Sequence, residues 1–214
     1  MVKAAIFGLA LAGVLAGCEA ALSAGGSGSA RSAKSAPARM VVADGALVIA
    51  GPAGYCVDTT ASHDGAGGAF VLLGSCASLS GSAASRTPAN PAILTASVFA
   101  GSGDDAAFAA SFPAMARFLS SDAGRAALSR SGQAQSVVIA QITSANAVML
   151  IRASDRAPAK GQDVEAEYWR ALMSVKGQIV TLSVLGLRDL PLNAEVKRQL
   201  LEAFVAKVRA ANRG

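Results

Sequence analysis

Residues 168–187, YWRALMSVKGQIVTLSVLGL, contain two runs in which every second residue is apolar or small. This period of two is typical of β-strands with a buried face, and Lys176-Gly177 between the runs is a turn signal. With a two-residue turn, the alternating apolar side chains of both strands lie on one side of a hairpin. The predicted facing pairs are Met173 with Val180, Ala171 with Leu182, and Trp169 with Val184.

The opposite side of this hairpin carries Tyr168, Leu172, Ile179 and Leu185, which are also mostly apolar. A strand that is apolar on both sides is buried on both sides. We therefore expect a second layer of structure to cover this face.

After the hairpin, the sequence predicts an amphipathic helix that begins at Asn193, a favoured N-cap residue. Its apolar residues recur every fourth position, and the charged residues between them are predicted to face water. The apolar set is Val196, Leu200, Phe204 and Val208, with Leu201 and Val205 alongside. The charged set is Glu195, Lys197, Arg198, Glu202, Lys207 and Arg209.

Upstream, the chain alternates between strand and helix signals. Met40–Ala43 and Ala46–Ala50 flank Asp44-Gly45, a pair that favours a type I′ hairpin turn. Residues 69–76 and 92–99 are predicted strands, separated by Gly-, Ser- and Pro-rich loops at 61–68 and 80–91.

Between residues 111 and 153, the sequence predicts two short helices and a further hairpin. Ser111 is expected to cap a helix that opens with Phe112-Pro113, and a second helix starts at Ser121. Residues 136–143 and 147–153 form the hairpin, with a turn at Ala145-Asn146. Its expected facing sets are Val138, Ala140 and Ile142 against Ala153, Ile151 and Met149.

This element order indicates an α+β fold, with helices packed on an antiparallel sheet and an amphipathic helix at the C-terminus. Residues 92–212, which end in strand, Gly turn, strand GQIVTLSVLG and terminal helix, are similar in outline to PsbP-like domains. The resemblance lies in element order. It implies an accessory or binding module and transfers no individual residue.

The charge content excludes two classes of protein. Charged residues make up 15% of the 214 residues, below the roughly 25% of an average soluble protein, and the formal net charge is +5. Residues 40–214 contain 15 basic and 13 acidic side chains, so most of the excess lies before residue 40. We therefore expect no nucleic-acid partner, since phosphate recognition needs denser Lys and Arg, and no coiled coil.

The first 18 residues follow the pattern of an export signal. Lys3 precedes an uncharged stretch, Ala4–Gly17, that is too short to span a bilayer comfortably and matches a signal-peptide core. It ends in Leu15-Ala16-Gly17-Cys18, which resembles the lipobox of bacterial lipoproteins. The alternative is an ordinary secretory signal with a cysteine there by chance.

The lipobox resemblance implies cleavage before Cys18, a diacylglycerol on its sulfur, and an acyl chain such as palmitate on the new N-terminus. Two or three chains anchor a protein durably, whereas one binds marginally. Glu19 follows the cysteine. In Gram-negative lipoproteins the inner-membrane retention signal is typically Asp at that place, so the resemblance implies the outer membrane, facing the periplasm.

Three segments follow from this interpretation. Residues 1–17 are a lipoprotein signal peptide, 18–39 are the lipidated cysteine with a flexible Ala/Gly/Ser linker, and 40–214 are a single periplasmic α+β domain.

Cys56 and Cys76 are expected to form a disulfide, since an isolated cysteine pair in an oxidising compartment most simply pairs. The alternative is a metal site in which both join His63 and Asp64, but this spacing matches no established zinc pattern. We assign no metal, cofactor or catalytic residue.

Other catalytic motifs are missing from the sequence. His63 is the only histidine, and neither a G-x-S-x-G elbow nor a Walker ending accompanies it. The acidic pairs Asp104-Asp105 and Glu165/Glu167 are expected to be solvated.

Three functional hypotheses remain from the sequence. The first is a lipid-anchored accessory or binding module that meets another envelope protein. The second is a small periplasmic hydrolase or metal-dependent enzyme that uses the loop of His63 and Asp64. The third is a structural lipoprotein that binds cell-wall or envelope polymers.

Overall fold

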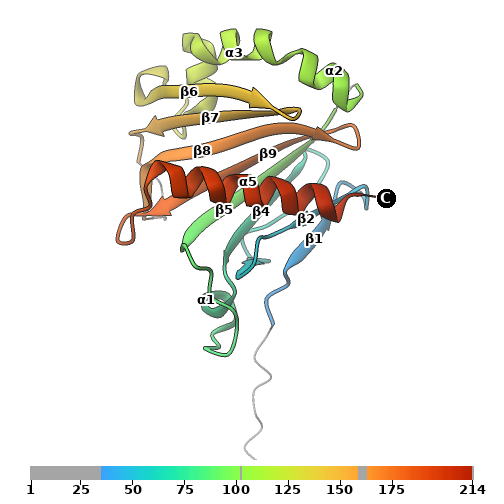
Figure 1. The fold of residues 1–214 in the computed structure, drawn as a ribbon, viewed down its shortest axis with the longest axis vertical. Helices are drawn as coiled ribbons and strands as arrows, with labels where there is room; N and C mark the ends of the chain where they lie inside the picture. Colours follow the sequence, from blue (N-terminus) through green and yellow to red (C-terminus); the bar gives the residue numbers. More distant parts are fainter. Residues whose placement is uncertain (1–34, 102, 159–162, 214) are drawn as a thin grey trace, which may run out of the picture. The chain divides into compact units, whose positions relative to one another are not determined.

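The computed structural model describes residues 35–101, 103–158 and 163–213, so the predicted leader, Cys18 and most of the linker lie outside them. Its main element is a seven-stranded antiparallel sheet with helices, which confirms the predicted α+β fold (Figure 1). In spatial order the strands are β3 (Tyr55–Val57), β4 (Ala69–Ser75), β5 (Ala92–Ala100), β9 (Gln178–Leu187), β8 (Val164–Val175), β7 (Val148–Asp155) and β6 (Val137–Ala145).

The central hairpin, β8–β9, has the register that the sequence predicts. Met173 pairs with Val180, Ala171 with Leu182, and Trp169 with Val184. The turn residues Lys176 and Gly177 have φ angles of 52° and 76°, as a two-residue hairpin turn of type I′ requires.

One face of the sheet is covered by α5 (Ala194–Ala211) and by the hairpin of β1 (Arg39–Val42) and β2 (Leu47–Ala50). Asn193 caps α5 as predicted, because its side chain accepts a hydrogen bond from the N–H of Val196 at 2.9 Å. At the other end, the amide of Asn212 bonds both the N–H and the C=O of Val48. The helix is thereby joined to β2 and closes the larger of two apolar cores.

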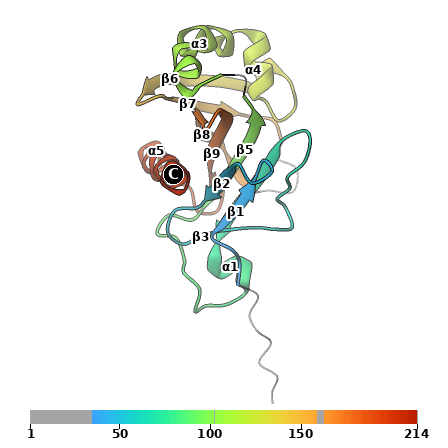
Figure 2. The same cartoon turned by 90° about the vertical axis from the view of Figure 1, so that its right-hand side faces the viewer.

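The opposite face is covered by α2 (Asp105–Ala110), α3 (Phe112–Ser120) and α4 (Asp122–Leu128), near the β6 edge (Figure 1 and Figure 2). This confirms the expected second layer. Its core is made by Phe112, Leu119, Leu128, Val137, Met149, Ile151, Ala153 and Tyr168.

The predicted hairpin at Asp44-Gly45 is also confirmed. Asp44 and Gly45 have φ angles of 53° and 89°, and the N–H of Ala46 donates to the C=O of Ala43 at 2.9 Å. These two strands pair with each other and form a small separate sheet.

The predicted register of the β6–β7 hairpin is wrong. Val138 pairs with Ser154, and a bulge between Ile139 and Gln141 shifts the remaining pairs, so Ile142 faces Ile151. The turn lies at Asn146-Ala147, one residue later than expected. Since a one-residue shift exchanges the faces of a strand, Val138 points outward and is half exposed.

The second helix follows from Ser121 as predicted, and this serine caps α4. Ser111 stands at the N-cap position of α3, but its side chain does not make the expected capping hydrogen bond. Because α2 ends directly before α3, the hydroxyl of Ser111 donates to the C=O of Phe108 and does not bond the first turn of α3. The sequence also did not predict β3, the short helix α1 (Cys76–Ser80), α2 or the 3-10 turn η1 (Ala134–Ser136).

The main core yields a stability test. Phe204 of α5 is fully buried, whereas Phe118 of α3 is 52% exposed. We expect Phe204→Ala to lower the free energy of unfolding by about 3–5 kcal/mol, because it leaves a cavity, and Phe118→Ala to change it by less than about 0.5 kcal/mol. Urea unfolding of both variants measures the difference, and equal losses would contradict the assignment of this core.

Candidate functional site

The two cysteines of the domain form a disulfide, as predicted, with a Cα–Cα distance of 4.8 Å. Cys56 lies in β3 and Cys76 directly follows β4, so the bond fastens the short edge strand β3 to its neighbour. Neither sulfur remains a thiolate that could bind a metal.

The loop of His63 and Asp64 is anchored through its backbone. His63 and Phe70 exchange two backbone hydrogen bonds of 2.8 Å, and the two rings stack with centroids 5.8 Å apart. Both His63 and Asp64 are exposed. In the described part of the chain, no group of three His, Cys, Asp or Glu side chains is placed to hold a metal ion.

Cys18 lies outside the described residues, so its predicted lipidation is not visible here. Of the helices within residues 35–101, 103–158 and 163–213, none has the length and apolar character that a membrane crossing needs.

Lys197 on α5 is a buried charge, and the prediction that this residue faces water is wrong. Its side chain is 1% exposed, and its ammonium group lies 3.1 Å from Glu165 and 3.4 Å from Glu167. It also donates to the C=O of Glu167 at 3.2 Å. The solvated pair expected at Glu165/Glu167 is therefore half of an ion cluster beneath the first turn of α5.

A local widening of β8 positions the two glutamates. Between the pairs Val164–Leu187 and Tyr168–Leu185, three residues of β8 face only Gly186 of β9. A Cβ atom on Gly186 would lie 1.7 Å from Oε2 of Glu165, so a side chain at this position would displace the carboxylate. The same oxygen accepts the N–H of Leu192 at 3.2 Å.

Arg152 completes the cluster from β7, since its guanidinium donates to Oε2 of Glu167 from Nε at 3.0 Å and Nη2 at 2.7 Å. Burial raises the pKa of Glu167, but the hydrogen bonds from Arg152 and the charges of Lys197 and Arg152 outweigh it and hold this pKa below its usual range. Glu167 is therefore ionised at neutral pH.

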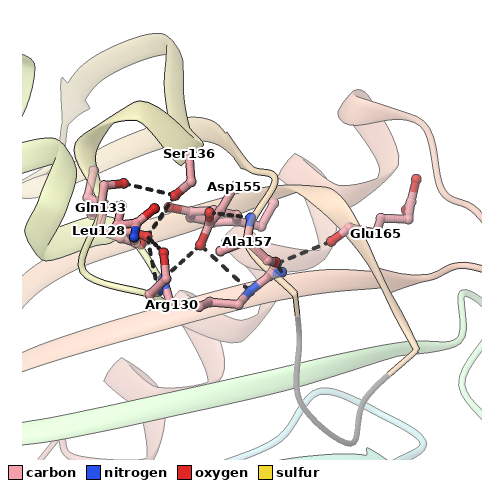
Figure 3. Close-up of polar contacts among 10 residues, drawn as sticks. Leu128, Arg130, Gln133, Ser136, Asp155, Ala157 and Glu165 are labelled. Atoms are coloured by element: carbon pink, nitrogen blue, oxygen red, sulfur yellow. Dashed lines mark hydrogen bonds and ion pairs between the residues drawn. The ribbon is translucent and has the colours of Figure 1, made fainter.

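A fully buried carboxylate, Asp155, lies nearby at the end of β7 (Figure 3). It accepts the backbone N–H of Arg130 at 2.7 Å and that of Ala157 at 2.9 Å. The Arg130 guanidinium in turn donates to the C=O of Ala157 at 3.1 Å and to that of Glu165 at 3.3 Å. Burial raises the pKa of Asp155, yet these backbone donors and the Arg130 charge leave it lowered overall.

A cavity of about 720 Å³ opens between these groups, with Arg156 and Arg188 also on its wall. Its acids are engaged by the domain's own cations, in the pairs Arg130–Asp155, Arg152–Glu167, Lys197–Glu165, Lys197–Glu167 and, at the rim, Arg188–Asp163. A general base works best with a pKa near 7, whereas the pKa values of Glu167 and Asp155 are lowered. The arrangement is suited to holding α5, β7 and β8 together.

The spacing of residues in α5 could have predicted that Lys197 is buried. Lys197 lies four residues before Leu201, seven before Phe204 and eleven before Val208, which places it at the head of the buried stripe of α5. A lysine on such a stripe needs a carboxylate, and the alternating Glu165 and Glu167 were the available pair.

No family model, curated protein or solved structure matches this chain. The resemblances to lipoprotein leaders and to PsbP-like domains therefore stay predictions.

The disulfide closes a loop of 20 residues between Cys56 and Cys76. We expect replacement of both by Ser to lower the free energy of unfolding by about 3 kcal/mol, because the unfolded chain regains the freedom of that loop. Urea unfolding measures it. The wild-type chain under reductant is the control and should lose the same amount. A double variant as stable as the oxidised wild type would contradict this role.

Because Lys197 is buried beside two carboxylates, its replacement is predicted to lower the stability of the fold by an amount that depends on pH. At pH 7, we expect Lys197→Met to lower the free energy of unfolding by about 1–3 kcal/mol, because Glu165 and Glu167 lose their buried counter-charge. Since the folded pKa of Glu167 lies below its ordinary 4.5, the attraction is present above that pH and fades as the pH falls through the lowered value.

The loss caused by Lys197→Met should therefore be smaller at a pH below the lowered pKa of Glu167 than at pH 7, because a protonated carboxyl needs no cation. Urea unfolding at both pH values tests this, with Lys207→Met, on the exposed side of α5, as the matched control. An equal loss at the two pH values would show that packing, and not charge, is what Lys197 supplies.

Proposed function

We propose that this chain is a lipid-anchored lipoprotein of the bacterial envelope whose α+β domain acts as an accessory binding module. The observation that carries the proposal is the sequence Leu15-Ala16-Gly17-Cys18 at the end of an apolar stretch of signal-peptide length. Glu19 favours the outer membrane, with the domain facing the periplasm.

The disulfide supports an oxidising compartment, because such bonds persist outside the cytosol and are rare within it. A periplasmic location satisfies this condition and agrees with an exported, membrane-attached chain.

The place where the predicted linker joins the domain supports a role in which the domain is presented to another envelope protein. The C=O of Pro37 accepts the N–H of Val57 in β3 at 2.7 Å, and the C=O of Ala38 accepts that of Gly51 at 3.2 Å. Since β3 is one edge of the sheet and β6 the other, residues 37–38, which end the predicted linker, lie beside the β3 edge. The β6 edge is then the part of the sheet farthest, in strand order, from residues 37–38, and another envelope protein can approach it there.

Palmitate labelling in a Gram-negative host tests the anchor. We expect the full chain to incorporate label and to yield a mature N-terminus at Cys18 that carries diacylglycerol, whereas Cys18→Ser takes up none because it lacks the acceptor sulfur. The Cys56→Ser/Cys76→Ser double variant is the matched control and should still be labelled. An unmodified N-terminus by mass spectrometry would reject the anchor.

A further inference from the structure

Strand β6 leaves one side of its backbone free in the part of the chain that the structure describes. It is the last strand of the sheet, and no described strand pairs with its outer side. Its sequence, VVIAQITSA, has neither a charge nor a proline, the residues that usually protect an edge strand. The outer N–H and C=O groups of this nine-residue strand can therefore pair with another extended chain.

A groove runs beside this edge. It has a volume of about 910 Å³, and it is lined along one wall by residues 137–142 of β6 and along the other by Ala116, Arg117 and Ser120 of α3. A strand edge facing a helix across a groove is the geometry in which domains bind a peptide as an added strand. Val138, half exposed at this edge, offers an apolar contact to a side chain of such a peptide.

The charged residues of the groove indicate which kind of peptide segment it would bind. Its only charged lining residues are Arg117 and Arg125. Arg125 is bonded to the exposed Asp122 and to the C=O of Ser120, whereas Arg117 forms no ion pair within the described residues. An extended segment with carboxylates is complementary to this lining.

Two other occupants fit the charges less well. A second copy paired through β6 would bring its own Arg117 and Arg125 against these, and β6 contains no acid to compensate. The chain's own residues 19–34 carry two cations and one acid, so they are also not complementary.

We propose that this groove binds an extended acidic segment of a partner protein, which adds to β6 as an eighth strand. The inference rests on the proposed binding role and is independent of lipidation. It names the edge that the binding module uses and the chemistry of its partner.

A synthetic nonapeptide, Ser-Asp-Val-Thr-Val-Asp-Val-Thr-Ser with blocked ends and a fluorophore, is the probe. Binding to the full chain in detergent is measured by anisotropy, against the same peptide with Lys in place of Asp. We expect the acidic peptide to bind at least about tenfold more tightly. We expect Arg117→Glu to remove this preference and Arg86→Glu, an exposed arginine outside the groove, to retain it.

N-methylated peptides test strand addition itself. Methyl groups on alternate amides block one edge of the peptide, and a second version blocks the other. One version should lose at least about tenfold in affinity while the other binds normally, because only one edge faces β6. Equal behaviour of the two versions would overturn the proposal.

Two further outcomes would also overturn it. One is no binding of the acidic peptide up to about 1 mM. The other is a dimer, seen by sedimentation of the full chain, that Val138→Lys dissociates, since the edge would then belong to a second copy. Palmitate labelling of the same preparations separates the two proposals: a labelled chain that ignores the peptide rejects only the groove, and an unlabelled chain that binds it rejects only the anchor.

Discussion

The register of the β8–β9 hairpin sets the position of every layer around it. Both faces of this hairpin are buried, since Met173 and Val180 face α5 and the N-terminal hairpin, while Tyr168 lies under α3 and α4. A slip of one residue would exchange the two sets of side chains and place Arg170 in an apolar core. The short turn at Lys176-Gly177 prevents this slip, because both residues hold the positive φ that the register requires.

Lys197 fixes the position of α5 along the sheet. Apolar contacts between a helix and a sheet tolerate sliding, whereas an ammonium group that bonds Glu165 and Glu167 is satisfied at one position along the helix. A buried ion pair is weak support for stability in itself, because desolvation opposes the attraction. Its effect here is to fix how far α5 extends across β8, with Gly186 leaving the space that Glu165 occupies.

Periodicity predicted the central hairpin, the terminal helix and its Asn193 cap, because strong alternation and a capping residue act over a few neighbouring positions. The β6–β7 register was not predictable in the same way, since the bulge near Ala140 leaves no trace in the apolar pattern. Strand β3 was missed because it has three residues and depends on its neighbours for pairing.

The candidate functional residues also fall into those that the sequence predicts and those that only the folded structure brings together. The Cys56–Cys76 pair followed from composition, since two cysteines in the domain leave one pairing. The cluster of Lys197, Glu165 and Glu167 joins residues up to 32 positions apart, and it forms only once the helix lies on the sheet. The groove at β6 depends on how α3 lies beside an edge strand, which no local pattern encodes.

A domain held by a membrane at one sheet edge and by a partner at the other would carry mechanical tension across its strands. The weakest step on that route is β3, which meets β4 through only three residue pairs. The Cys56–Cys76 bond spans this step, so β3 stays covalently joined to the end of β4 even when their backbone pairs separate. The cysteines thus reinforce the strand pair of the sheet that has the fewest paired residues.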